Sequence, residues 1–409
     1  MYIKRNLEET ILRYLNAPEI IAVVGPRQAG KTSLVSHLFE GLKGAVLLSF
    51  EDQRILGLFE KNIDDFITAY VRGNRYLFID EFQYAHSGGK LLKYIYDTQK
   101  IKIVISGSSA IDLTVRATKY LVGRILIFQL YPFDFREYVS ATDEAAAKLL
   151  DVYRENIDFT RESTTSIPKS VHAILLKHYE DYLLFGGYPR VVLEQNRTSK
   201  KELLRNIYNT YFLREVRDIL GLIDDYKLSN LIQGLALQIG NLIEYNELSR
   251  LSEYSFSSVK KYINFFEKTY ICRRVRPYYT NKRTEIVKNP KIFFFDAGLR
   301  NSVVNDFRPL RERNDAGALA ENGIAMEAIK KEYQLNFWRD KKKHEVDFIV
   351  SMGEDRRIAV ESRRYATVYD LRILATIKNA YPSMPTFLSY CETDGSIKGN
   401  GGAFPAYLF

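Results

Sequence analysis

The sequence of 409 residues has few cysteines, no long apolar run and no internal repeat. Its two cysteines, Cys272 and Cys391, are too few for a framework of disulfides, and they lack the spacing of zinc ligands. The longest apolar stretches, at residues 19–24 and 124–130, are far too short to span a bilayer. The first residues lead into a charged helical pattern, which differs from the apolar core of a signal peptide. We therefore expect a cytoplasmic protein without a membrane partner.

The composition is that of a folded protein with a basic balance. Hydrophobic residues make up 46% of the chain and charged residues 27%, which is typical of globular domains. The length predicts more than one domain. The formal charge of +9 permits a nucleic-acid partner, although a basic balance alone does not identify one.

Short apolar segments alternate with helical patterns in the first third of the chain. Strands that alternate with helices form a parallel sheet with helices on both faces, so residues 1–140 are expected to be an α/β domain. Such sheets bind their ligand at the carboxyl ends of the strands, where this sequence has glycines, serines and carboxylates. The predicted strands are residues 20–24, 45–50, 76–79, 101–105 and 125–130.

A glycine-rich loop follows the first of these strands. Residues 25–32 read Gly-Pro-Arg-Gln-Ala-Gly-Lys-Thr and lead into a helical pattern. In this arrangement backbone N–H groups point toward phosphate, Lys31 contacts the β- and γ-phosphates, and the Thr32 hydroxyl binds Mg²⁺. The sequence therefore predicts a P-loop that binds a nucleoside triphosphate. The residues expected to contact the nucleotide are Gly25, Pro26, Arg27, Gln28, Ala29, Gly30, Lys31, Thr32 and Ser33.

Two carboxylates, Asp80 and Glu81, end the third predicted strand. We expect Asp80 to bind the Mg²⁺ of the nucleotide and Glu81 to orient or deprotonate the attacking water. Ser108 follows the fourth strand. Its hydroxyl either contacts the γ-phosphate or the water, or only forms a turn after Gly107.

The order of these motifs resembles the AAA-type ATPases, and among them a prokaryotic family with a C-terminal region of unassigned function. The resemblance implies ATP and Mg²⁺ as ligands, Asp80 and Glu81 as the Walker B pair, and Ser108 on the sensor strand. It also implies Arg124 as an arginine finger, and a finger that acts in trans requires a homo-oligomer. The other interpretation of Arg124 is a surface ion pair. The matching segments are residues 25–32, 78–83, 105–109, 121–124, 131–137 and 185–189.

Residues 141–225 are predicted to form a helical lid or linker, with a break at residues 186–189. Residues 226–285 are predicted to form a winged helix-turn-helix. Its helices would be residues 230–239, 246–252 and 257–268, followed by a strand at 271–276 and a basic wing at 280–283. Its buried stripe would be Leu248, Leu251, Val259, Ile263 and Phe266.

A winged helix-turn-helix places its last helix in the major groove and its wing on phosphates. Such modules also bind proteins, so DNA and protein partners both stay open. The candidate residues for contact with nucleic acid are Ser257, Lys260, Lys261, Asn264, Lys282 and Arg283.

Residues 286–409 are expected to be a second α/β domain, with strands at 291–295, 337–338, 346–350, 358–361 and 386–390. Asp347 and Glu361 fall on neighbouring strands, and an upstream helix can bring in Glu321. Carboxylates grouped in this way bind a metal ion that activates water against a phosphodiester. The segment resembles the PD-(D/E)xK nuclease superfamily, of restriction-endonuclease-like fold, except that Arg363 stands where the motif has lysine.

Because arginine stays protonated, it cannot replace the lysine in every role. A working nuclease, a relic that binds nucleic acid, and ordinary charges of a hairpin are the three interpretations of this segment.

The sequence leads to one favoured hypothesis for the whole chain and two alternatives. The favoured hypothesis is a Mg²⁺-dependent ATPase that couples hydrolysis of ATP to DNA binding or DNA-associated remodelling. The first alternative is an ATP-regulated, metal-dependent nuclease. The second is a nucleotide-gated switch that holds protein partners and has no significant turnover.

Overall fold

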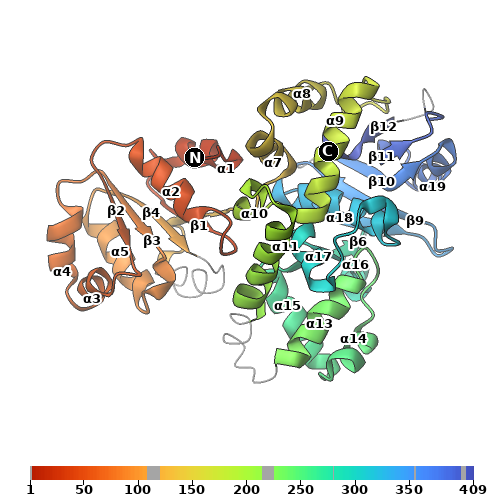
Figure 1. The fold of residues 1–409 in the computed structure, drawn as a ribbon. Coiled ribbons are helices and arrows are strands. Elements are labelled where there is room, and N and C mark those ends of the chain that lie inside the picture. Colours follow the sequence, from red (N-terminus) through yellow and green to blue (C-terminus); the bar gives the residue numbers. More distant parts are fainter. Residues whose placement is uncertain (1, 108–119, 214–224, 280, 354–355, 398–401) are drawn as a thin grey trace. The chain divides into compact units, whose positions relative to one another are not determined.

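The computed structural model describes residues 2–107, 120–213, 225–279, 281–353, 356–397 and 402–409 (Figure 1). The chain divides into two compact units. The first unit comprises Met1–Phe133 and Lys268–Tyr270, and the second comprises Asp134–Glu267 and Ile271–Phe409. None of the helices in the described part of the chain is long and apolar enough to cross a membrane.

The first unit contains a five-stranded sheet in the order β2-β3-β4-β1-β5. All neighbouring strands are parallel, so their carboxyl ends meet at one edge. The predicted strands are confirmed to within one or two residues at each end. The strands are β1 Ile20–Val24, β2 Ala45–Ser49, β3 Tyr76–Asp80, β4 Lys102–Gly107 and β5 Ile125–Gln129.

Helices cover both faces of this sheet, as the alternation of strands and helices predicts. Along β1, Ile20 and Ala22 join a cluster that includes residues of α3 and α5, while Ile21 and Val23 join a cluster with α1 and α2. This alternation arises because successive side chains of a strand point to opposite faces. The helices are α1 Asn6–Tyr14, α2 Lys31–Glu40, α3 Gln53–Lys61, α4 Ile63–Phe66 and α5 Gly88–Thr98, with a π-helical segment at Ile67–Val71 and a 3₁₀ turn at Phe82–Tyr84.

The second unit contains a mixed seven-stranded sheet in the order β12-β11-β10-β9-β8-β6-β7. The pairs β10–β11, β11–β12 and β6–β8 are parallel, and β6–β7, β8–β9 and β9–β10 are antiparallel. Helix α18 packs against β7, β8 and β10, and α19 packs against β9, β10 and β11. The strands are β6 Cys272–Pro277, β7 Lys291–Phe294, β8 Gln334–Arg339, β9 Glu345–Ser351, β10 Arg357–Ala366, β11 Thr386–Thr393 and β12 Gly402–Pro405.

Helices make up the rest of the second unit, and the chain breaks between α9 and α10 at the predicted place. Gly186, with φ of +72°, follows the last residue of α9, and a Cβ there would lie 2.0 Å from a carboxylate oxygen of Asp296. The helices are α7 Phe135–Thr142, α8 Glu144–Glu155, α9 Lys169–Phe185, α10 Pro189–Leu193, α11 Arg197–Asn206, α13 Asp225–Leu237, α14 Tyr245–Ser252, α15 Phe256–Lys268, α16 Lys282–Val287, α17 Ala297–Val304, α18 Ala316–Lys330 and α19 Leu371–Ala380, with shorter turns at Ile207–Leu213, Leu310–Glu312, Val368–Asp370 and Ala406–Leu408.

Candidate active site

The glycine loop joins β1 to α2 in a shape that only glycine permits at two positions. A Cβ on Gly25 would lie 2.0 Å from the backbone oxygen of Leu130, so no side chain fits there. Gly30 has φ of +95°, in the left-handed region, and is the N-cap of α2. The loop therefore follows the carboxyl end of β1 closely and leads into the amino end of a ten-residue helix. Backbone N–H groups at such a helix end attract phosphate.

Lys31 and Thr32 are the first two residues of α2. The Lys31 ammonium donates hydrogen bonds to the backbone oxygens of Gly25, at 3.1 Å, and Pro26, at 2.9 Å. Its side chain is buried, and the charge is therefore held over the loop. Thr32 Oγ1 donates to Asp80 Oδ2 at 2.7 Å. The structure thus brings together the loop threonine and the aspartate that ends β3, 48 positions apart in the chain.

Asp80 is buried and is held by three donors. Besides Thr32 Oγ1, its carboxylate accepts hydrogen bonds from Ser106 Oγ and from the backbone N–H of Glu81, the latter at 3.0 Å. Ser106 lies on β4 and is fully buried. Ser106 was not predicted from the sequence; the predicted residue, Ser108, lies outside the described residues. The available signal was a serine at the carboxyl end of an apolar strand, next to the strand of Asp80.

Glu81 begins the turn after β3 with φ of +55°, a left-handed conformation that is uncommon for a residue other than glycine. Its carboxylate accepts a hydrogen bond from Gln83 Nε2. The side chain is half-buried, at the same strand edge as the loop. Gln83, whose amide fixes the orientation of Glu81, is a second site residue that was not predicted from the sequence.

Arg5 connects the loop to the chain that leaves β5. Its guanidinium donates to the backbone oxygen of Ala29 at 2.8 Å and to that of Tyr131 at 2.6 Å. It also lies 4.8 Å from the centroid of the Phe133 ring, a distance typical of a cation–π contact. Because the side chain is buried, these contacts hold one loop carbonyl in place. No sequence motif pointed to Arg5.

Arg124 lies at the opposite edge of the sheet from the loop. It precedes β5, and its backbone oxygen accepts from the N–H of Ile20 at the start of β1. Strands β1 and β5 are parallel and in register from Ile20 to Val24, so the loop begins one strand length away, about 16 Å at 3.3 Å per residue. The side chain forms an ion pair with Asp97 at 3.1 Å. Arg124 therefore forms a surface ion pair and lies one strand length from the glycine loop of its own chain.

The residues at this edge fit a Mg²⁺-bound nucleoside triphosphate. The donor set is a lysine ammonium, a hydroxyl and the N–H groups of a helix end, all suited to phosphate. Thr32 Oγ1 and Asp80 Oδ2 are hard oxygen ligands of the kind that Mg²⁺ prefers, and they already lie side by side. The close packing of Gly25 against Leu130 leaves no room for a side chain at this position of the loop.

The predicted carboxylates of the second unit surround a buried lysine. Lys291 of β7 lies 2.6 Å from Glu345 Oε1, 3.4 Å from Asp347 Oδ1 and 3.8 Å from Glu321 Oε2. Burial disfavours its charged form, but Asp347, Glu321 and Glu345 more than offset this and raise the pKa of Lys291. The ammonium therefore stays charged at the centre of this group.

Arg363 contributes a second cation to the same group. Its guanidinium forms ion pairs with Glu361, with Asp347 Oδ2 at 3.4 Å and with Asp370 Oδ1 at 3.2 Å. Burial, and then repulsion from Asp347, raises the pKa of Glu361 well above its usual value. The same two causes raise the pKa of Glu321 to about 8.

The structure brings the predicted metal ligands Glu321, Asp347 and Glu361 together, and their oxygens face Lys291 and Arg363. Within the part of the chain that the structure describes, no group of three or more His, Cys, Asp or Glu side chains is arranged to hold a metal ion. The buried Lys291 and the partly buried Arg363 pair with the carboxylates that a metal would need.

The predicted face of α15 is exposed for the most part. Ser257, Lys260, Lys261 and Asn264 are exposed on the helix, and Arg283 is exposed on α16. The predicted wing at residues 280–283 is thus partly helical, and the side chain of Lys282 lies outside the described residues. Burial is confirmed for Leu248, Val259, Ile263 and Phe266 of the predicted stripe. The prediction that Leu251 is buried is wrong, because its side chain is 47% exposed.

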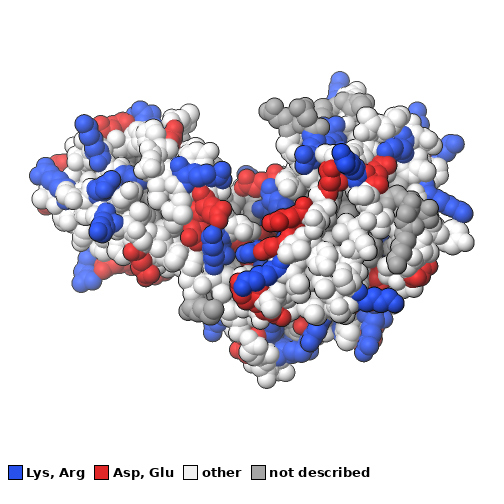
Figure 2. All heavy atoms as spheres, turned by 90° about the horizontal axis from the view of Figure 1, so that it is seen from above, with Lys and Arg blue, Asp and Glu red and all other residues white. Residues whose placement is uncertain are grey.

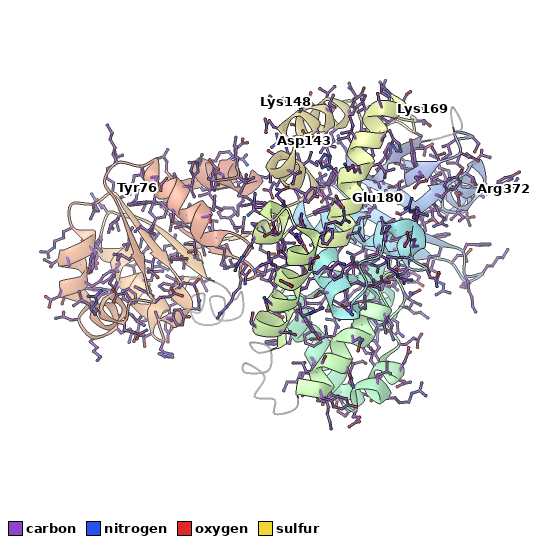
Figure 3. All side chains as sticks on the ribbon, viewed as in Figure 1. Tyr76, Asp143, Lys148, Lys169, Glu180 and Arg372 are labelled. Atoms are coloured by element: carbon purple, nitrogen blue, oxygen red, sulfur yellow. The ribbon has the colours of Figure 1, made fainter. Side chains whose placement is uncertain are left out.

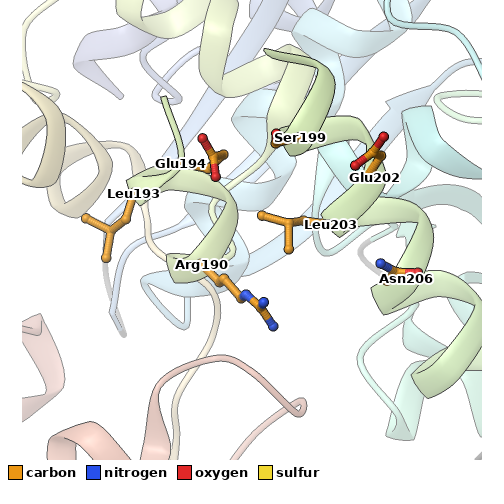
Figure 4. Close-up of a pocket in the computed structure, with 7 residues that line it drawn as sticks. All are labelled: Arg190, Leu193, Glu194, Ser199, Glu202, Leu203 and Asn206. Carbon is orange, nitrogen blue, oxygen red and sulfur yellow. The ribbon is translucent and has the colours of Figure 1, made fainter. Parts of the chain in front are cut away.

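A hollow on the surface of the second unit is lined by none of the predicted site residues. It lies between α10 and α11 and has a volume of about 530 Å³ (Figure 4). Its lining combines Arg190 with Glu194, Glu202 and two leucines. This mixture favours no particular ligand charge.

Three family models match separate parts of the chain. Residues 17–139 match an AAA domain, residues 176–310 match a domain of unknown function (DUF8612), and residues 316–407 match another (DUF4143). The first match ends close to the end of the first unit at Phe133.

Several relatives are similar along most of the chain. An uncharacterized protein of Haemophilus influenzae is 23% identical over 377 residues, which cover 87% of this chain and 85% of that protein. Two uncharacterized proteins of Methanocaldococcus jannaschii are 23% and 25% identical; the matches cover 83% and 87% of this chain and 74% and 78% of those proteins. Among solved structures, the Walker-type ATPase PABY2304 of Pyrococcus abyssi is similar, with 16% identity, a TM-score of 0.48, and coverage of 74% of this chain and 96% of that chain.

Proposed function

We propose that this chain, in which residues 17–139 form an AAA-type P-loop domain and residues 316–407 a DUF4143 domain, hydrolyses ATP with Mg²⁺ at the loop of residues 25–32. The observation that carries the proposal is the 2.7 Å hydrogen bond from Thr32 to Asp80, beside the buried Lys31. A loop lysine, a loop hydroxyl and a strand-end carboxylate are the three groups that phosphoryl transfer requires of a P-loop protein.

Each residue has a defined task in this proposal. Lys31 exchanges its two carbonyl partners for phosphate oxygens and compensates negative charge on the β- and γ-phosphates. Thr32 and Asp80 would hold Mg²⁺, which when bound neutralises the triphosphate and orients it. Glu81, held by Gln83, orients the attacking water and accepts its proton. Ser106 keeps Asp80 in the orientation that faces Thr32.

We further propose that the second unit binds DNA and that ATP turnover responds to it. The support is the order of elements from α13 to β7. Leu242 follows α13 and forms an isolated bridge with Lys291 of β7. Then come α14, α15, β6, α16 and β7, with β6 and β7 antiparallel. A helix, a bridging residue, two helices and two antiparallel strands are the parts of a winged helix-turn-helix, and here α16 lies between the two strands. The exposed Lys260, Lys261 and Asn264 on α15 suit a DNA groove.

We propose no metal-dependent nuclease, since Lys291 and Arg363 already neutralise the carboxylates that such an enzyme would use. The basic surface of α15 favours DNA over a purely protein-binding switch.

The test is ATP turnover by wild type, Lys31→Ala and Glu81→Gln, each with and without duplex, single-stranded and branched DNA. We expect both variants to lose at least about 100-fold in kcat, because each removes a charge that acts on the reacting phosphate or water. One form of DNA is expected to raise the turnover of wild type. Lys43→Ala, which removes an exposed lysine near the amino end of β2, is the matched control and should retain wild-type turnover.

Two results would contradict the proposal in different ways. Binding of ATP by wild type without hydrolysis under any condition would replace the ATPase with a nucleotide-gated switch. Turnover that depends on Lys31 but is indifferent to every DNA would keep the ATPase and remove the DNA partner.

A further inference from the structure

A small basic pocket lies in the second unit between α15, β6 and the segment that leads into β7. Its volume is about 210 Å³. Lys260 and Asn264 are one turn apart on α15 and therefore lie on one face of the helix. Arg274 and Arg276 alternate on β6 and therefore point to one side of the strand. These four residues, Lys288, Asn289 and Tyr245 are the polar residues of its lining; we call this hollow the basic pocket.

Two of the four cations are fixed in place by their neighbours. Arg274 Nε donates to Glu267 Oε2 at 2.9 Å, and its guanidinium also donates to Asn264 Oδ1. The Lys260 ammonium lies 4.3 Å from the centroid of the Phe256 ring and 5.4 Å from that of Tyr245. Such contacts limit side-chain motion and lower the entropy that binding of an anion must remove.

The other two cations are exposed and available. Arg276 and Lys288 form no ion pair with any carboxylate of the described residues, and both side chains are exposed. Glu267, which pairs with Arg274, does not line the pocket, and neither does any other carboxylate. On the face seen in Figure 2, by contrast, basic and acidic side chains are interspersed. The basic pocket therefore concentrates positive charge where most of the visible surface does not.

The size and position of the pocket indicate which anion it suits. Pockets for drug-sized ligands measure roughly 300–1,000 Å³, so about 210 Å³ suits a single phosphate group better than a whole nucleotide. The pocket adjoins the exposed face of α15, and Ile286 and Val287 on its rim are 65% and 76% exposed. Proteins that place a helix in a DNA groove use nearby cations on the phosphate backbone to fix that helix.

We propose that the basic pocket binds a backbone phosphate of a nucleic acid. Arg276 and Lys288 donate hydrogen bonds to the phosphate, and Arg274 and Lys260, which their neighbours hold in place, add positive charge beside it. This inference rests on the proposed function, because α15 and the basic pocket would contact the same nucleic acid. The group that the pocket binds is a phosphodiester, which both DNA and RNA carry.

The experiment compares wild type with Arg276→Ala/Lys288→Ala by fluorescence anisotropy of labelled duplex DNA and duplex RNA over a series of salt concentrations. Each lost phosphate contact lowers the slope of log K against log salt by about 0.9. We expect the double variant to bind at least about 10-fold more weakly, with a slope smaller by about 1–2. The nucleic acid that shows this loss is the source of the phosphate. The basal ATP turnover of the double variant should be unchanged, because neither Arg276 nor Lys288 belongs to the nucleotide site.

The control is Arg372→Ala/Lys169→Ala, which removes the same charge from α19 and from the start of α9 (Figure 3). It should bind as wild type does. Arg276→Lys keeps the charge and should therefore show a salt slope close to that of wild type, unlike the double alanine variant.

Two outcomes overturn the inference and remain distinguishable from each other. If wild type binds DNA or RNA and the pocket variant binds with the same affinity and slope, the basic pocket is not a phosphate site, while the proposed DNA partner survives. If wild type binds neither polymer at low salt, both the pocket and the proposed DNA coupling fail.

Discussion

At the scale of single residues, the nucleotide site depends on the carboxylate of Asp80, which accepts hydrogen bonds from three donors. Asp80 accepts from Thr32, from Ser106 and from a backbone N–H, so its position at the end of β3 is fixed. A buried carboxylate that accepts from three donors is held in one orientation, which suits a ligand of Mg²⁺. Of these donors, only Ser106 can be removed without touching the loop or the backbone.

Ser106→Ala is expected to lower kcat about 10-fold and the stability of the first unit by about 1–3 kcal/mol, since a buried acceptor loses a charge-assisted hydrogen bond. Steady-state ATP turnover and thermal unfolding measure the two effects. Ser36→Ala on α2 is the matched control, and it should change neither quantity. Wild-type turnover in Ser106→Ala would mean that Thr32 and the N–H of Glu81 suffice to orient Asp80.

At the scale of elements, the second unit is organised around a buried charge group that joins β7, β9, β10 and α18. Lys291 and Arg363 come from β7 and β10, and the carboxylates come from β9, β10 and α18. Breaking such a group by removing one cation would leave buried carboxylates without a partner and strongly destabilise the fold. The group therefore links four elements, although its carboxylates resemble a metal site in sequence.

The pKa of Glu321 leads to a prediction about pH. A carboxyl whose pKa is raised from 4.5 to about 8 by burial, and then by Asp347, keeps its proton in the folded state while the unfolded state ionises. Its effect is a loss of stability as pH rises from 4.5 to 8. The raised pKa of Lys291 does not act in this window, because that lysine is charged in both states below its ordinary pKa of 10.5.

Glu321→Gln should therefore match wild type near pH 4.5 and become more stable toward pH 8, by about 1–3 kcal/mol. Urea unfolding of the second unit at several pH values measures this difference. Glu155→Gln, an exposed change on α8, should follow wild type throughout. Equal stability of Glu321→Gln and wild type at pH 8 would contradict the raised pKa.

At the scale of the whole molecule, each of the two compact units contains hydrophobic clusters built from its own residues. The cores on both faces of the first sheet consist of residues of the first unit, and the cluster around Trp338 and α19 consists of residues of the second. Units with their own cores unfold as separate cooperative transitions, and a ligand stabilises only the unit that binds it.

Mg²⁺ with a non-hydrolysable ATP analogue should raise the midpoint of only one unfolding transition in calorimetry. A ligand at 100 times its Kd stabilises by about 2.7 kcal/mol. Lys31→Ala should lose this shift, and Lys43→Ala should keep it. A single transition that moves as a whole would contradict independent units.

The sequence by itself determined the first unit and the position of its loop. Five short apolar strands that alternate with helical patterns predict a parallel sheet, although not the order of its strands, and the loop requires glycine at positions 25 and 30. The helices α13, α14 and α15 were also predicted, except for their exact ends, because their apolar spacing is local. Strand β12, short and without periodicity, was missed.

Tertiary structure alone decided which side chains meet. Ser106 meets Asp80 because β3 and β4 are neighbours in the sheet, and Arg124 is separated from the loop because β5 begins at the far edge. Lys291 enters the carboxylate group because β7 lies beside α18, although it is 56 positions from Asp347. Local spacing in a sequence fixes periodicity and turns, whereas long-range pairing fixes distances between charges. The chemistry of both candidate sites is therefore set by contacts that no short motif contains.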